Sequence, residues 1–164
     1  MMNLSLWGMA TGLINLNKKI MAKYIKPTLK TKFYIDFNWW AQDEGSFHRT
    51  LIDQLCDECR ATVGDTPEPR PMDWVDPETG QVFTIDQLWH VLHTQCAHKP
   101  DFLSDALPIT SAVFRLFIAN NNTPLSAPEI HQHLHRKSAN TILRTIGGVK
   151  TYKGIRAKVP LLST

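Results

Sequence analysis

The last third of the chain contains three short apolar patterns, each bounded by residues that start or stop helices. Ser126 and Glu129 have the spacing of a capping box, in which each side chain satisfies a backbone N–H at the start of a helix. Ser138 can cap a further helix in the same way. Upstream, an apolar pattern from about Thr110 to Ala119 stops at three consecutive asparagines, 120–122, which tolerate left-handed backbone angles. This arrangement predicts three short helices joined by tight turns.

The residues after the third pattern predict a small basic hairpin. Gly147 and Gly148 are expected to end the third helix by permitting positive φ. Residues 149–152 and 155–159 then alternate around Lys153-Gly154, which is typical of a hairpin turn. Helix, short helix, tight turn, helix and two-stranded ribbon, in that order, resemble the winged helix-turn-helix domain of DNA-binding proteins over residues 109–159.

The resemblance implies that the third helix enters the major groove and that the hairpin wing touches the DNA backbone or minor groove. It places candidate contacts on the third helix and on the wing, and the basic turn before the third helix adds two more. In chain order these candidates are Arg136, Lys137, Ser138, Asn140, Thr141, Arg144, Lys150, Lys153, Arg156 and Lys158.

Charge is divided sharply along the chain and supports DNA as a partner independently of the resemblance. Residues 109–164 carry eight basic side chains and one acidic one, and residues 1–32 carry six lysines and no acid. Residues 33–108 carry four basic and fourteen acidic side chains. Lysines and arginines neutralise phosphates and release counterions, which is the main sequence-independent term in DNA affinity. The acidic segment would be repelled by DNA, so we expect it to bind a protein partner, to self-associate or to regulate.

These observations predict a mostly α-helical protein with a small amount of β-structure, of the α+β class. Residues 1–20 are interpreted as a disordered extension or as sequence upstream of a true translation start at Met21. Residues 21–108 would form an acidic, tryptophan-rich α+β module with a basic N-terminal arm, and residues 109–164 the basic winged-helix-like module. No stretch is apolar and long enough to span a bilayer, so we expect a cytoplasmic protein with no membrane partner.

The acidic segment is expected to alternate helices with a hairpin. The pattern predicts a strand over 33–37, one continuous helix over 46–63 and a hairpin that pairs residues 74–75 with 82–83. A helix capped by Thr84 is expected from Asp86 to about residue 97.

The three cysteines of the chain all fall between residues 56 and 96 and allow a zinc hypothesis. Cys56 and Cys59 form a C-x2-C pair, and His93 and Cys96 an H-x2-C pair, which together supply the four ligands that tetrahedral zinc prefers. The alternative is that the thiols are reduced and packed in the core, since cysteine is among the most buried residue types. His90 and His98 leave the identity of a fourth ligand open. An odd number of cysteines argues against a disulfide scaffold.

The chain carries none of the sequence patterns of common catalytic sites, such as a phosphate-binding Gly-rich loop, a G-x-S-x-G elbow or an H-E-x-x-H helix. We therefore predict that it is not an enzyme and needs no cofactor apart from the zinc considered above. The favoured function is a DNA-binding protein that acts as a transcriptional regulator. The alternative is a protein-interaction adaptor with a winged-helix fold, stabilised by zinc if the cysteines bind it.

Overall fold

The computed structural model describes residues 26–64, 66, 68 and 70–159, and within them the chain is mostly helical with two small antiparallel sheets. This confirms the predicted fold class. The predicted extension over residues 1–20 and the proposed start at Met21 lie outside the described residues. In chain order the elements are β1 (Lys32–Ile35), α2 (Phe37–Trp40), α3 (Glu44–Asp53), α4 (Asp57–Val63), β2 (Pro71–Val75), β3 (Val82–Asp86), α5 (Gln87–Thr94), the 3₁₀ helix η1 (Cys96–His98), α6 (Ile109–Ala119), β4 (Leu125–Ser126), α7 (Ala127–Leu134), α8 (Ala139–Ile146) and β5 (Ile155–Ala157).

A three-stranded sheet joins the beginning of the described chain to its end. Its order is β4-β1-β5, with both pairings antiparallel, so β1 lies between two strands of the basic segment. Phe33 and Ile35 of β1 are fully buried, whereas Tyr34 between them is not. Successive side chains of a strand point to opposite faces, so Tyr34 belongs to the outer face of the sheet.

The predicted two-stranded wing is wrong. Residues 149–151 form no strand, and Tyr152 makes only an isolated bridge to Ile155. β5 pairs with β1 instead, which lets Ile155 be buried with Phe33 and Ile35. Val149 is fully exposed, so a ribbon built from residues 149–152 would have gained little apolar burial there.

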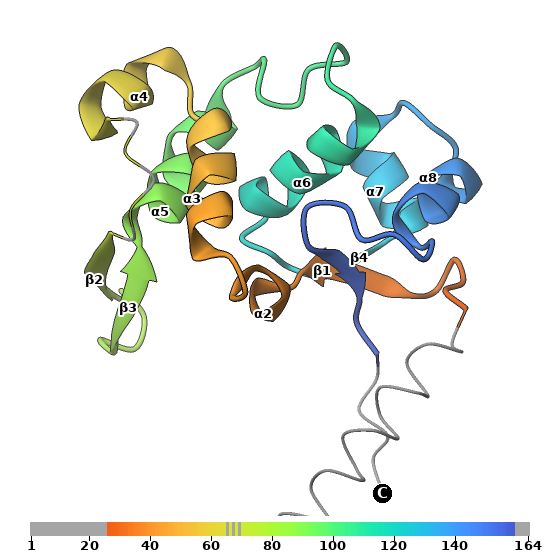
Figure 1. The fold of residues 1–164 in the computed structure, drawn as a ribbon, viewed down its shortest axis with the longest axis horizontal. Coiled ribbons are helices and arrows are strands. Elements are labelled where there is room, and N and C mark those ends of the chain that lie inside the picture. The colour runs from red at the N-terminus through yellow and green to blue at the C-terminus, as the bar shows by residue number, and fades with distance from the viewer. Residues whose placement is uncertain (1–25, 65, 67, 69, 160–164) are drawn as a thin grey trace, which may run out of the picture.

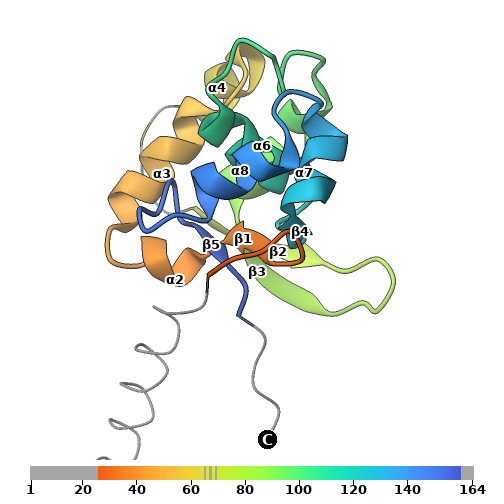
Figure 2. The same ribbon diagram turned by 90° about the vertical axis from the view of Figure 1, so that its right-hand side faces the viewer.

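Helices α6, α7 and α8 lie together on one side of this sheet, as Figures 1 and 2 show. The two serine caps are confirmed: Ser126 Oγ accepts from the Glu129 N–H, and Ser138 Oγ accepts from the Thr141 N–H. The Glu129 carboxylate accepts chiefly from the Ser126 hydroxyl rather than from the backbone N–H that a capping box predicts. Asn121 and Asn122 adopt positive φ after α6, also as predicted. Gly147 does not, because its φ is −94°, so the expected left-handed end of α8 is wrong.

The stretch over 46–63, predicted as one continuous helix, is divided between two helices, α3 and α4. α3 ends at Asp53, and Cys56 has extended backbone angles (φ −70°, ψ 161°) before α4 begins. At the break, the N–H groups of Gln54 and Leu55 bond to carbonyls only three residues back, which closes α3 with a tight final turn. Gln54 and Leu55 are both buried, so tertiary packing accounts for a break that contains no glycine or proline.

The predicted hairpin is confirmed as β2 and β3, in register Trp74↔Phe83 and Val75↔Val82. It projects from the body beside α5 (Figure 1). Asp86, rather than the predicted Thr84, caps α5 by accepting from the N–H groups of Leu88 and Trp89. Buried apolar side chains from the acidic and basic segments form one continuous cluster. Within the described part of the chain, every helix is too short or too polar to cross a bilayer.

Candidate nucleic-acid interface and cysteine cluster

Helix α8 presents a polar face opposite its buried one. Ile142 and Ile146 are buried in the core, four residues apart on one side of the helix. Asn140 and Arg144 are exposed, and their spacing of four residues places them along one other side, while Lys137 is exposed in the turn just before the Ser138 cap. We call these three residues the α8 surface. Neither Lys137 nor Arg144 forms an ion pair with a described residue.

Two of the residues predicted to contact DNA, Ser138 and Thr141, instead form hydrogen bonds with each other at the start of α8. The Ser138 hydroxyl donates to Thr141 Oγ1 at 2.9 Å while it accepts from the Thr141 backbone N–H. These bonds fix the first turn of α8 and thereby orient the α8 surface. Ser138 and Thr141 therefore have a structural task at the start of the helix, which the sequence alone assigned only to Ser138.

Arg136 is directed toward the body of the protein rather than outward. Its side chain is 17% exposed and lies 3.9 Å from the Asp105 carboxylate. Its Nη1 atom is buried and makes no hydrogen bond within the described part of the chain. Of the two basic residues predicted in the turn before α8, only Lys137 faces solvent.

The turn over residues 152–155 is held against the acidic segment. Lys153 and Gly154 both have positive φ (53° and 74°), as in the primed turns of hairpins, and the Ile155 N–H bonds to the Tyr152 carbonyl at 2.9 Å. The indole N–H of Trp40 donates to the Lys153 carbonyl at 3.0 Å. A Cβ on Gly154 would lie only 2.4 Å from Trp40 Nε1, so glycine is required for this close approach.

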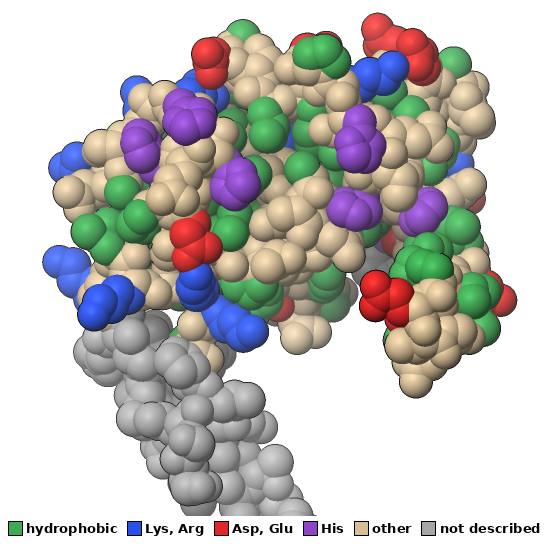
Figure 3. All heavy atoms as spheres, turned by 180° about the vertical axis from the view of Figure 1, so that it is seen from behind, with side chains coloured by type: hydrophobic (Ala, Val, Ile, Leu, Met, Phe, Trp, Pro, Cys, Tyr) green, Lys and Arg blue, Asp and Glu red, His purple; other side chains and the backbone are tan. Residues whose placement is uncertain are grey.

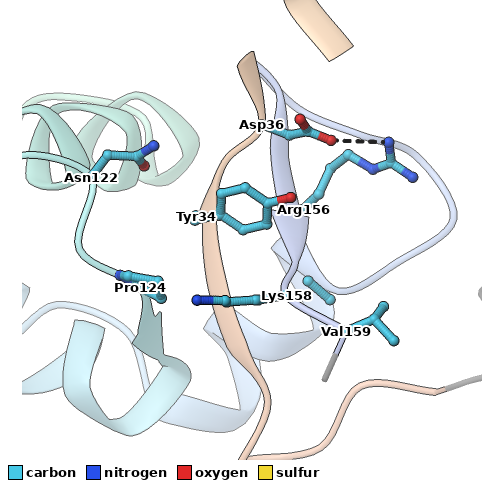
Figure 4. A pocket seen from close by; sticks show the side chains of 8 residues that line it. Tyr34, Asp36, Asn122, Pro124, Arg156, Lys158 and Val159 are labelled. Carbon is cyan, nitrogen blue, oxygen red and sulfur yellow. Dashed lines mark hydrogen bonds and ion pairs between the residues drawn. The ribbon is translucent and has the colours of Figure 1, made fainter. Parts of the chain in front are cut away.

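The outer face of the sheet forms an open pocket of about 540 Å³ with basic and aromatic walls (Figure 4). Tyr34 on β1 lies opposite Arg156 on β5, and Lys158 follows just beyond β5. Arg156 Nη1 is 3.3 Å from the buried carboxylate of Asp36, so its charge is partly compensated, whereas Lys158 forms no ion pair with a described residue. Tyr34 was not among the sequence candidates, although its place in an alternating strand was a usable signal.

The basic side chains of residues 109–159 have few acidic neighbours within that segment. The carboxylate of Glu129, the single acid in residues 109–164, is already engaged by Lys32 and by the Ser126 hydroxyl. Lys150 lies over the Tyr152 ring, 5.1 Å from its centroid. In Figure 3, Lys and Arg side chains gather at the end of the molecule that carries α7 and α8, while acidic side chains occur on the hairpin at the other end.

All three cysteines converge at one place, although 40 residues separate the first from the last. The Sγ atoms of Cys56, Cys59 and Cys96 lie within 4.8 Å of one another, and Cys56 and Cys96 are 3.2 Å apart. Cys59 and Cys96 are buried and Cys56 is partly exposed. We call these three residues the cysteine cluster. His93 does not join it, because no ring nitrogen of His93 lies within this group, and its Nδ1 is 3.0 Å from the Ile118 carbonyl.

The three thiols are in different electrostatic states. Burial raises the pKa of Cys96 to about 12. Burial also acts to raise the pKa of Cys56, but hydrogen bonds from the Cys59 backbone and from the neighbouring thiols outweigh it, and the pKa of Cys56 falls below its usual range. Burial raises the pKa of Cys59 as well, so Cys56 is the most readily ionised of the three thiols when no metal is bound.

Comparison with known proteins adds no assignment: no family model, curated protein or solved structure matches this chain.

Proposed function

We propose that this protein binds duplex DNA through the α8 surface and the basic residues that follow it, and that it acts as a transcriptional regulator. The observation that carries the proposal is that Arg144 on a short, capped helix and Lys137 in the turn just before it are both exposed, and that neither has a compensating carboxylate among the described residues. Asn140 lies between them and can donate to and accept from a base edge, the property that allows asparagine to pair with adenine in the major groove.

Basic residues after α8 would extend this surface along the DNA backbone. Lys150 and Lys158 are exposed, and neither forms an ion pair with a described residue. The close packing of the 152–155 turn on Trp40 makes it a rigid element rather than a long, free wing. Backbone contacts from a rigid turn would fix the register of α8 without reading sequence themselves.

The test is binding to a mixed pool of duplex DNA at several salt concentrations, followed by sequencing of the retained fraction. Four phosphate contacts, from Lys137, Arg144, Lys150 and Lys158, would give a slope of log affinity against log salt of about −3.6. Enrichment of a defined site would support a regulator, and salt-sensitive binding without enrichment would support non-specific DNA binding. No binding at low salt would refute the proposal.

Arg144→Ala is the matched variant for this experiment, and Arg49→Ala is its control. Both arginines are exposed on helices and neither forms an ion pair with a described residue, so the two changes alter net charge equally. Arg144→Ala should weaken binding and reduce the salt slope by about 1, whereas Arg49→Ala on α3 should change neither. The double variant Arg144→Ala/Lys150→Ala should bind more weakly still while remaining folded.

The second candidate function is a protein-interaction adaptor, and one observation favours it. The β2–β3 hairpin exposes Val75, Val82 and Phe83 (56%, 61% and 45%) among the acidic side chains of the N-terminal half. Exposed apolar side chains of this kind commonly mark a contact with another protein. An adaptor would bind its partner with little dependence on salt, which separates it from the DNA-binding proposal.

A further inference from the structure

The cysteine cluster brings together every cysteine of the chain from two helical segments that are distant in sequence. Cys56 immediately precedes α4 and Cys59 lies in its first turn, whereas Cys96 begins η1. None of the three forms a disulfide. Thiols that are buried only for packing have no need to meet one another, and here each is within reach of the other two.

One backbone N–H and one ammonium group near the cluster can stabilise negatively charged sulfur, while Gln95 Oε1 accepts from the Cys59 thiol at 3.3 Å. The Cys56 N–H donates to Cys96 Sγ at 3.3 Å. The Lys99 ammonium group is close enough to act electrostatically on both Cys56 and Cys59. Hydrogen bonds of this kind are made to the ligand atoms of metal sites and fix their orientation.

Helix α4 has few apolar contacts with the core, which come from Cys59 and the partly buried Val63. It has seven residues, and Cys59 is the one buried side chain among them. It lies at the edge of the molecule, next to the N-terminal half of the core (Figure 1). A metal ion held by Cys56, Cys59 and Cys96 would attach both α4 and the end of α5 to one point, which hydrophobic burial alone does little to achieve here.

We propose that the cysteine cluster is a zinc site with three thiolate ligands from Cys56, Cys59 and Cys96, and that His93 is not a ligand. This goes beyond DNA binding, because the site lies in the acidic half and concerns its architecture. Thiolate sulfur is a preferred ligand of Zn²⁺, and zinc completes a tetrahedral shell with a fourth group. With three protein ligands, a solvent molecule takes the fourth position, and it enters on the side of Cys56, the partly exposed cysteine.

Charge balances in the binding step. Zn²⁺ replaces the protons of three thiols, so three protons pass to solvent for each ion bound when all three sulfurs start protonated. The resulting Zn²⁺ trithiolate carries one net negative charge. Lys99 lies beside it and favours this charge, although its own charge is partly compensated by Glu58, whose Oε2 is 2.9 Å from its Nζ.

The experiment measures zinc in the full-length chain, produced in zinc-supplemented medium, purified under reducing conditions and freed of any affinity tag. About one zinc per chain is expected, since one set of ligands is present. Titration of the native protein with a thiol-specific mercurial should release that zinc as three thiols are blocked. Replacement of zinc by Co²⁺ should produce a thiolate-to-cobalt charge-transfer band in the near ultraviolet.

Two variants test the ligand assignment. His93→Asn retains a side-chain N–H for the Ile118 carbonyl and should keep the full zinc content and the cobalt band. Cys59→Ser should lose both, and circular dichroism would show whether it remains folded. If it unfolds, the mercurial titration of the native chain still decides between three thiols per zinc and fewer.

Three results would overturn the proposal. The first is folded, reduced protein that contains no zinc and gives no charge-transfer band with Co²⁺. The second is loss of zinc in the His93→Asn variant, which would make His93 a ligand. The third is a Cys56–Cys96 disulfide in protein purified under reducing conditions, since a disulfide would remove two of the three ligands.

Discussion

Gly154→Ala should destabilise the fold much more than an alanine at a glycine with the same backbone angle but free space around it. Gly154 has φ +74°, and an added Cβ would lie 2.4 Å from Nε1 and 2.8 Å from Cδ1 of Trp40. Trp40 is buried and its indole N–H bonds to the Lys153 carbonyl, so it cannot simply swing away. Left-handed backbone costs an L-residue about 1–2 kcal/mol. Overpacking against the indole adds about 1–3 kcal/mol, and loss of the indole hydrogen bond about 0.5–1.5 kcal/mol.

Gly80→Ala is the matched control. Gly80 has φ +72° in the β2–β3 turn, and nothing lies within 4 Å of its added Cβ. The Gly80→Ala change should lower the free energy of unfolding only by the cost of a left-handed backbone at an L-residue, about 1–2 kcal/mol. Urea denaturation of both variants, with the free energy of unfolding extrapolated to water, measures the difference directly. Equal losses in the two variants, with unchanged urea dependence, would refute the conclusion that the 152–155 turn is clamped on Trp40.

Three further predictions concern the core, the sheet and the cysteines. Ile142→Ala, at a fully buried position, should cost about 2–5 kcal/mol in urea denaturation; a loss no larger than that of Leu143→Ala, which is only partly buried, would contradict the orientation of α8. Asn122→Gly should lower the free energy of unfolding by about 1–3 kcal/mol, because the Asn122 side chain accepts from the Ile35 N–H (2.8 Å) and donates to the Ile35 carbonyl (2.9 Å). Glycine tolerates the positive φ at this position, so the backbone should not be strained. Unchanged stability would mean that these two bonds do not hold β1. In metal-free reduced protein, Cys56 should react with iodoacetamide at a lower pH than Cys96. The thiolate is the reactive form, and the pKa of Cys56 is lowered while that of Cys96 is raised to about 12. Peptide mapping after brief labelling checks the order, and preferential labelling of Cys96 would contradict it.

Local signals in the sequence predicted the elements whose ends are determined by neighbouring residues. The serine caps of α7 and α8, the asparagines after α6 and the Lys153-Gly154 turn all depend on hydrogen bonds or backbone angles within about four residues. The β2–β3 hairpin has the same local character, with strands separated by a short turn. Each of these features was therefore accessible from residue type and spacing.

Tertiary contacts determined the features that the sequence did not predict. The strand β5 pairs with β1, which lies far away in the chain. The alternating pattern of residues 149–152 had suggested that this neighbouring segment would be its partner strand. The break between α3 and α4 falls at buried residues with no helix-breaking signal. In the cysteine cluster, spacing grouped three thiols that the fold brings together, but the choice of His93 as fourth ligand depended on the orientation of α5, which directs that ring toward Ile118.

The pairing of β1 with β5 also affects how the chain is made. Ile35 pairs with Ile155, so roughly 120 residues must be synthesised after β1 before its partner strand exists. Pairings between residues so distant in sequence favour slow folding. At a synthesis rate of about 5–20 residues per second, β1 waits on the order of 6–24 s for this partner. During that time β1 has an unpaired edge with Phe33 and Ile35 beside it, and such edges promote aggregation. Chains that terminate before β5 should therefore be prone to chaperone binding and degradation, even when every helix has already formed.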